Sequence, residues 1–159
     1  MMMETARLKI HILSDEEMER FIRTQTDEEL IKAYKEMLQG SVEHPEHRAW
    51  YAIWAIERPD GTPVGDLCFK GPPEKGAVEI GYGILAEQQG KGYATEAVGA
   101  AVNWALRQTD VICVEAETEP DNRASQRVLG KCGFVPNGVL GEEGPRFVRT
   151  AEQKESRSV

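Results

Sequence analysis

The chain has 159 residues, of which 40% are hydrophobic, enough for one domain with a real core. Its formal net charge of -8 argues against binding nucleic acid through a broad basic surface, and no run is long and apolar enough for a membrane span. Three widely spaced cysteines (Cys68, Cys113 and Cys132) fit reduced thiols. We expect one cytoplasmic domain (residues 1–159), ordered over about residues 6–151 with a polar tail at 152–159, and no nucleic-acid or membrane partner.

The first part of the chain is predicted to form a strand and two short helices. Residues 7–13 alternate in hydropathy, as a strand does. Ser14 and Thr26 are each followed three residues later by a glutamate, the pattern of a capping box. We therefore expect a helix after each of them, the second ending at Gly40.

Two of the three histidines, His44 and His47, flank Pro45 and Glu46. A metal site would need a third ligand, which is not visible nearby, and Pro45 favours an extended loop. We therefore predict a solvated loop here and no bound metal.

Three strands joined by tight turns are predicted next, over residues 50–57, 64–69 and 77–85. The connections at residues 58–62 and 71–76 contain the proline and glycine of turns. Strands joined in this way form an antiparallel meander.

The later part of the chain is predicted to alternate helices and strands. Residues 94–106 read as a packed helix and residues 111–116 as a strand, which implies a parallel pair and a right-handed crossover. A further helix is expected after Asp121 or Asn122, then two strands ending near Thr150. The fold class is therefore α/β with a mixed sheet.

The turn between residues 85 and 94 is rich in glycine. It leaves backbone N–H groups without partners at the positive end of a helix dipole, an arrangement that suits phosphate. Any Cβ at Gly90 or Gly92 would keep a diphosphate from the amides. Tyr93 follows where a P-loop has lysine, and Thr95 stands where the dinucleotide fingerprint has its third glycine. We predict a pyrophosphate cradle of another kind; the alternative is a turn that binds nothing.

Read as Gln89-x-x-Gly92-x-Ala94, this turn resembles the acetyl-CoA loop of the GCN5-related N-acetyltransferase (GNAT) family. The sequence Gly-Lys-Gly-Tyr-Ala-Thr-Glu-Ala at residues 90–97 is most similar to that of the branch that includes the ribosomal-protein N-terminal acetyltransferases (the RimJ/RimL type). A second resemblance, to the family's later helix, is Asn122-x-x-Ser125-x-x-Val128-Leu129-x-x-x-Gly133-Phe134. The layout is similar over about residues 7–150, but specific residues match only within residues 79–97 and 122–134.

The resemblance implies the GNAT acyl-CoA N-acyltransferase fold, with a mixed central sheet of six to seven strands flanked by about four helices. It implies acetyl-CoA as co-substrate, with the pantetheine arm in a gap between two splayed parallel strands. The acceptor would be an amine-bearing small molecule or a protein N-terminus, and the protein a monomer or homodimer. The implied cofactor-binding residues are Ile84, Leu85, Ala86, Gln89, Gly90, Lys91, Gly92, Tyr93, Ala94, Asn122 and Ser125.

Glu79 is the candidate general base for direct attack of an amine on the thioester in a ternary complex. Strand alternation places Glu79, Gly81 and Gly83 on one face, where two missing side chains leave room for a ligand. Related enzymes often place a glutamate here. Tyr82 falls on the opposite, apolar face and is assigned to the core. The alternative for Glu79 is a glutamate on a solvated strand face.

The proton donor is left open, because Leu129 stands where many family members have a tyrosine. Ser125 is the candidate acid or thiolate hydrogen-bond donor; an ordinary helix residue is the equal alternative. Two alternatives concern the whole protein. A cysteine-dependent acyltransferase is disfavoured, since no cysteine lies beside a histidine or a helix N-terminus. The other is a catalytically weak or inactive domain of the same fold that binds CoA or a partner.

Overall fold

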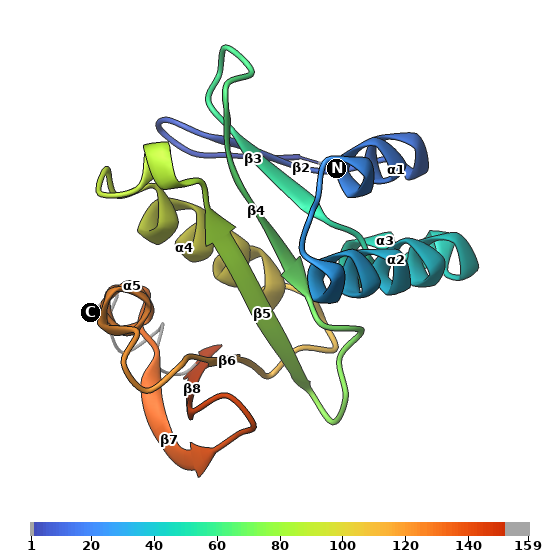
Figure 1. Ribbon diagram of the computed structural model, residues 1–159. Coiled ribbons are helices and arrows are strands. Elements are labelled where there is room, and N and C mark those ends of the chain that lie inside the picture. Colours follow the sequence, from blue (N-terminus) through green and yellow to red (C-terminus); the bar gives the residue numbers. More distant parts are fainter. Residues whose placement is uncertain (1, 152–159) are drawn as a thin grey trace.

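Eight strands form one sheet in the order β1-β2-β3-β4-β5-β6-β8-β7 in the computed structural model, which describes residues 2–151 (Figure 1). The strands are β1 (Met2–Glu4), β2 (Lys9–Ile12), β3 (Trp54–Glu57), β4 (Pro63–Phe69), β5 (Ala77–Ile84), β6 (Cys113–Glu117), β7 (Val135–Leu140) and β8 (Pro145–Thr150). The helices are α1 (Asp15–Arg23), α2 (Glu28–Glu43), α3 (Arg48–Tyr51), α4 (Tyr93–Leu106) and α5 (Arg123–Lys131), with short 3-10 turns η1 (Pro45–His47) and η2 (Ala86–Gln88).

The mixed sheet confirms the predicted fold class, with more strands and helices than expected. Strands β1 to β5 pair antiparallel in sequence, and β5 and β6 pair parallel. Strand β8 then lies between β6 and β7. The six to seven expected strands become eight because β1 adds to one edge, and the fifth helix is α3. The predicted polar tail at residues 152–159 lies outside the described residues.

The starts of the first two helices follow from side-chain caps. The Ser14 hydroxyl accepts the Glu17 N–H, and the Glu17 carboxylate accepts the Ser14 N–H, which confirms the capping box. The second cap is Asp27 rather than Thr26, since its carboxylate accepts the N–H groups at the start of α2. Helix α2 also continues past Gly40 to Glu43. A Cβ on Gly40 would lie 2.6 Å from the Tyr51 ring, so this glycine permits close packing rather than ending the helix.

The segment before β3 differs most from expectation. Residues 45–47 form the turn η1 rather than an extended loop, and Trp50 lies in α3 rather than in a strand. Arg48 holds α3 in place by bonding the Asp15 carboxylate at 2.6 Å and the Leu13 carbonyl at 2.8 Å. These contacts join segments more than 30 residues apart, which local patterning does not reveal. Within residues 2–151, no group of three His, Cys, Asp or Glu side chains is placed to hold a metal ion.

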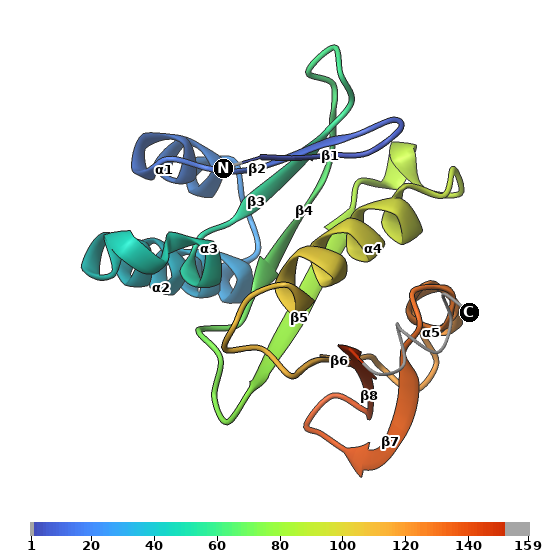
Figure 2. The ribbon, with the colours of Figure 1, turned by 180° about the vertical axis from the view of Figure 1, so that it is seen from behind.

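The two faces of the sheet are covered differently. Helix α4 lies behind β5 in Figure 1 and in front of it in Figure 2, so it covers one face. Its fully buried Ala97, Ala101 and Ala105 let it approach the strands closely. Trp54 and Trp104 also belong to this core. A smaller cluster under α1 and α2 packs on the other face. No described helix is long and apolar enough to cross a membrane.

Candidate functional site

Strands β5 and β6 separate after a short paired stretch. Their last paired residues are Glu79 and Glu115, whereas β5 continues to Ile84. The Glu79 carbonyl accepts the Lys70 N–H of the chain leaving β4, so the backbone groups of alternate residues (Ile80, Tyr82 and Ile84) point away from β4. The predicted splay of the parallel strands is therefore present, with an open β5 edge along the gap.

The glycine-rich turn lies at the end of this edge. Gly90 (φ 78°) and Gly92 (φ 83°) both adopt the left-handed conformation, and Gly92 is the N-cap of α4 without a side-chain cap. Within the described chain, no acceptor bonds the N–H groups of residues 90 to 95. Because the helix dipole adds positive potential at the same place, the turn is built to hold an anion.

Arg7, from the connection between β1 and β2, braces this turn from behind. Its guanidinium bonds the Glu96 carboxylate at 2.8 Å and the Lys91 carbonyl at 2.9 Å, and it lies 4.6 Å from the Tyr93 ring centre. A Cβ on Gly92 would come within 3.3 Å of this guanidinium. Arg7 thus holds the turn in place, and a side chain at Gly92 would press on it, whereas a Cβ on Gly90 would meet nothing within 4 Å.

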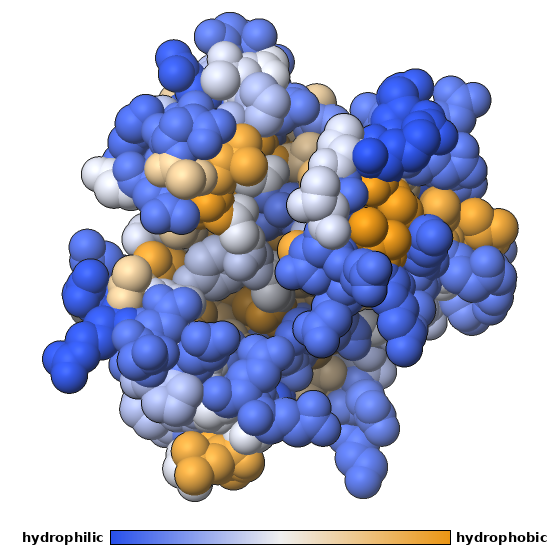
Figure 3. All heavy atoms as spheres, viewed as in Figure 1, coloured by the Kyte–Doolittle hydropathy of each residue, from blue (hydrophilic) through white to orange (hydrophobic). Residues whose placement is uncertain are grey.

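A cleft of about 610 Å³ lies between β5, the turn, the start of α4 and α5. We name it the cofactor cleft. The surface is hollowed over the C-terminal half of β5 (Figure 3). Its lining includes eight of the eleven predicted cofactor-binding residues: Ile84, Gln89, Gly90, Gly92, Tyr93, Ala94, Asn122 and Ser125. Leu85, Ala86 and Lys91 are not among the lining residues. Arg127 and Lys131, one turn apart on α5, add positive charge that the motifs did not indicate.

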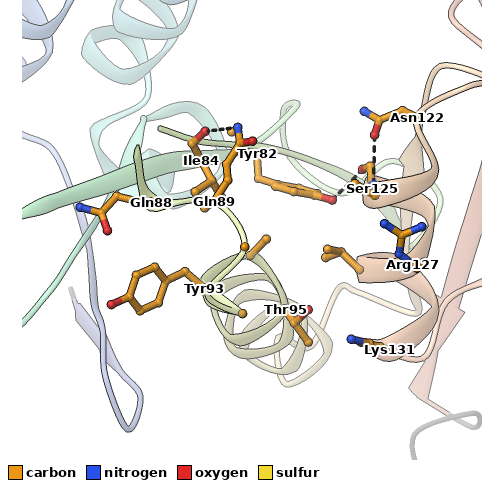
Figure 4. A pocket seen from close by; sticks show the side chains of 16 residues that line it. Tyr82, Ile84, Gln88, Gln89, Tyr93, Thr95, Asn122, Ser125, Arg127 and Lys131 are labelled. Carbon is orange, nitrogen blue, oxygen red and sulfur yellow. Dashed lines mark hydrogen bonds between the residues drawn. The ribbon is translucent and has the colours of Figure 1, made fainter. Parts of the chain in front are cut away.

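The α5 side of the cleft is organised by its first turn. Asn122 caps the helix by accepting the Ser125 N–H at 3.1 Å, which leaves its amide NH₂ to donate to a ligand (Figure 4). Ser125 Oγ lies 2.6 Å from the Tyr82 phenolic oxygen, which reaches it from β5. Leu129 is fully buried in the core. Tyr82 packs against the core as predicted, but its hydroxyl joins the site, a contact that strand alternation alone does not reveal.

Glu79 lies on the face of β5 opposite to Tyr82, at the point where β5 and β6 begin to separate. Its carboxylate bonds Lys70 at 2.9 Å and Arg146 at 2.9 Å. Arg146 also bonds Glu115 at 3.0 Å and Glu117 at 2.6 Å, so one guanidinium joins β5, β6 and β8. Burial raises the pKa of Glu79, but the hydrogen bonds from Lys70 and Arg146 outweigh it and hold the pKa below its ordinary value. The carboxylate is ionised at neutral pH.

A second cleft, of about 880 Å³, opens on this same face between α1, α2 and the strands β4 and β5. We name it the acceptor cleft. Gly81 and Gly83 form part of its floor, and Glu143, from the connection between β7 and β8, also lines it. Tyr82, Gly83 and Ile84 line both clefts, so the two meet at the open end of β5.

The three cysteines are not activated. Burial raises the pKa of Cys68 and of Cys132 to about 11, and also raises that of Cys113. Each is therefore a neutral thiol near pH 7. This weighs against the cysteine-dependent alternative, because the thiolate is the nucleophile in such enzymes.

Comparison with known proteins agrees with this geometry. Residues 4–135 match the family model of the acetyltransferase (GNAT) domain. Among curated relatives, the uncharacterized N-acetyltransferase YjdG of Bacillus subtilis is 40% identical over 91 residues, which span 56% of this chain and 54% of that protein. The uncharacterized N-acetyltransferase YoaA of the same species is 28% identical over 152 residues, 87% of this chain and 85% of that protein.

Solved structures share the fold at low sequence identity. The ribosomal L7/L12 α-N-protein acetyltransferase RimL, solved with coenzyme A, is 16% identical with a TM-score of 0.76, covering 96% of this chain and 99% of that one. A GNAT-family acetyltransferase from Bacillus anthracis is 19% identical with a TM-score of 0.70, covering 96% and 99%. The family match, the splayed strands and the glycine turn agree, and this chain belongs to the GNAT acetyltransferase family.

Proposed function

We propose that this protein binds acetyl-CoA in the cofactor cleft and transfers the acetyl group directly to a primary amine, without a covalent enzyme intermediate. The observation that carries the proposal is the run of partnerless N–H groups at residues 90 to 95, placed at the end of the open β5 edge. The N–H groups of the turn suit a diphosphate, and the open edge of β5 suits the amide-bearing pantetheine arm. Neighbours of the same fold were solved with coenzyme A, which supports the same ligand here.

The residues that would hold this co-substrate follow from the site. The turn would bind the diphosphate, with Arg127 and Lys131 adding charge-assisted contacts from α5. The Ile84 N–H and the free NH₂ of Asn122 would pair with the amides of the arm, while the Ile84 carbonyl already accepts the Gln89 side-chain amide at 3.0 Å. Acetyl-CoA supplies an activated acetyl group, and the cleft orients it toward the acceptor.

Transfer requires the acceptor nitrogen to bond the thioester carbon, the carbon–sulfur bond to break, and a proton to move from nitrogen to sulfur. Ser125 is the candidate donor to the departing sulfur, held in place by Tyr82. Glu79 stays the candidate acceptor for the amine proton, through a chain of waters. Its flanking cations keep it ionised, which supplies an empty proton site but makes it a weaker base.

The test is a mass-spectrometric screen of amines and peptides with acetyl-CoA, run beside calorimetric titration with CoA. Acetylated product together with saturable CoA binding is the expected result. CoA binding with neither transfer nor hydrolysis would favour the alternative of a binding domain of the same fold, for which the buried Leu129 is the motivating observation. Absence of CoA binding would reject both.

A further inference from the structure

The acceptor cleft has an apolar wall above a floor with few side chains. Phe21 of α1 and Tyr34 of α2 meet edge to face with ring centres 5.0 Å apart. Trp50 and Leu30 continue the wall. On the floor, Gly83 lies beside Asp66 of β4, whose carboxylate oxygen is 4.0 Å from the Cβ position of that glycine. Beside Gly83 the cleft is therefore open down to the backbone, with the Asp66 carboxylate at the edge of this opening, whereas the Lys70 side chain lies against Gly81.

Asp66 differs from the other carboxylates around the sheet. Its one hydrogen bond is from the Tyr34 hydroxyl, at 3.3 Å, and over residues 2–151 no Lys or Arg lies within ion-pair distance of it. Glu79, by contrast, is bonded to two cations. Burial raises the pKa of Asp66 more than the Tyr34 hydrogen bond lowers it. A partly buried carboxylate without a cation lowers stability, and a cationic ligand would offset this.

We propose that Asp66 and Tyr34 bind the ammonium group of the acceptor, and that the acceptor is a primary amine on an apolar alkyl or aromatic body. The proposal rests on the proposed function and names its substrate class. Aromatic faces and a carboxylate together recognise organic cations, and the apolar wall excludes water around them. An α-amino acid would bring its own carboxylate toward Asp66, so like charges disfavour it.

The other charged groups of the cleft do not compete for this role. Lys70 is bonded to Glu79 at 2.9 Å, and Glu36 of α2 is exposed. Glu143 lies in the exposed connection between β7 and β8. Asp66 is thus the lining carboxylate that combines burial, aromatic neighbours and the absence of a cation. Because Gly83 lines both clefts, an amine held at Asp66 lies next to the open edge of β5.

The experiment measures amine binding by calorimetry to the full chain saturated with CoA, so that no turnover occurs. The probes are phenethylamine and hexylamine, with 2-phenylethanol and phenylalanine as their uncharged and carboxylate-bearing counterparts. We expect saturable binding of the two amines and at least tenfold weaker binding of the counterparts. Asp66→Asn should weaken amine binding about 10- to 100-fold, as expected for loss of a charged hydrogen bond, and Tyr34→Phe by less.

A matched control is Asp110→Asn, which removes an exposed carboxylate before β6 and should leave amine binding unchanged. Thermal unfolding and CoA titration show that each variant is folded and loaded. Equal amine binding by the wild type and Asp66→Asn would overturn the role of Asp66. If CoA binds but neither amine does, the substrate class is wrong while the cofactor site stands. If CoA itself does not bind, the proposed function fails first.

Discussion

The phenolic oxygen of Tyr82 and Oγ of Ser125 lie 2.6 Å apart and join β5 to α5 at the cofactor cleft. Ser125 is also fixed by its backbone N–H, which the Asn122 cap accepts. Burial raises the pKa of Tyr82 despite the Ser125 hydrogen bond, so the phenol stays protonated and able to donate. Tyr82 thus brings a hydroxyl from β5 to the cofactor cleft, whereas Leu129 of α5 is buried in the core.

Removing either hydroxyl should lower turnover. We expect Tyr82→Phe and Ser125→Ala each to reduce kcat about tenfold, the scale of one hydrogen bond, while the Kd for CoA changes less than threefold. Because the two hydroxyls act as a pair, the double variant should be no slower than the slower single variant. Steady-state kinetics and CoA calorimetry check this. Normal turnover in Ser125→Ala would remove the pair from the chemistry.

A bulky residue at Gly92 should abolish tight CoA binding. We expect Gly92→Leu to weaken it at least about 30-fold, because the side chain would press on the Arg7 guanidinium that braces the turn and would displace the N–H groups that the turn presents. Gly61 is the matched control, since it also has a positive φ (89°) but nothing within 4 Å of its Cβ position. Both variants should lose about 1 kcal/mol of stability from strain. Equal CoA affinity in the Gly92 and Gly61 variants would refute the proposal that the turn binds the diphosphate of CoA.

Local sequence signals indicated the conformation of the glycine-rich turn and the start of α4. The left-handed Gly92 and the unbonded N–H groups after it depend on neighbours within a few residues, which a motif contains. The Ser14 cap could be predicted for the same reason, because its partner Glu17 is only three residues away. The predicted cap at Thr26 was wrong by one residue, because the Asp27 carboxylate accepts the N–H groups of Glu29 and Leu30.

The acceptor side depends on contacts between distant segments. Arg146 meets Glu79 across 67 residues of sequence, and Tyr34 meets Asp66 across 32. Tyr82 shows the same limit, because alternation assigned its ring to the core correctly while α5 brought Ser125 to its hydroxyl. Pairing of this kind is set by strand order and helix packing, which composition and spacing do not determine.

Replacing Glu79 should separate a proton-transfer role from a role in the ion-pair network. If it accepts the amine proton, Glu79→Gln should lower kcat at neutral pH by about 100-fold with CoA affinity nearly intact. Glu115→Gln is the control, since Glu115 bonds the same Arg146 at 3.0 Å from β6. A kinetic comparison at pH 7 checks this. Equal losses in both variants would assign Glu79 to the network alone.

Arg146→Met should destabilise the fold in a pH-dependent way. The pKa of Glu79 is lowered from its ordinary value of 4.5, so its stabilising contribution is complete above that value and is lost as the pH falls through the folded pKa. We expect a loss of about 2 kcal/mol at pH 7 that shrinks below pH 4.5. Urea unfolding at pH 7 and below pH 4.5 measures this loss of stability. Arg23→Met, which removes an exposed arginine, is the control. A loss of stability that does not vary with pH would contradict a stabilising ion pair between Arg146 and Glu79.

Asp66→Asn should make the protein more stable at neutral pH while weakening amine binding. The pKa of Asp66 is raised by burial, so the folded state favours its protonated form, and stability declines as the pH rises through the unfolded value of 3.8 toward the folded one. Above that window the wild type retains an uncompensated carboxylate, which asparagine removes while still accepting the Tyr34 hydroxyl.

We expect Asp66→Asn to raise Tm by about 2 °C at pH 7 and to show a smaller gain near pH 3.5. Scanning calorimetry at both pH values measures the shift, with Asp110→Asn as an exposed control that should change Tm little. A saturating amine should raise the Tm of the wild type more than that of the variant, because it binds the carboxylate. A variant less stable than the wild type at pH 7 would mean that Asp66 supports the fold rather than the ligand.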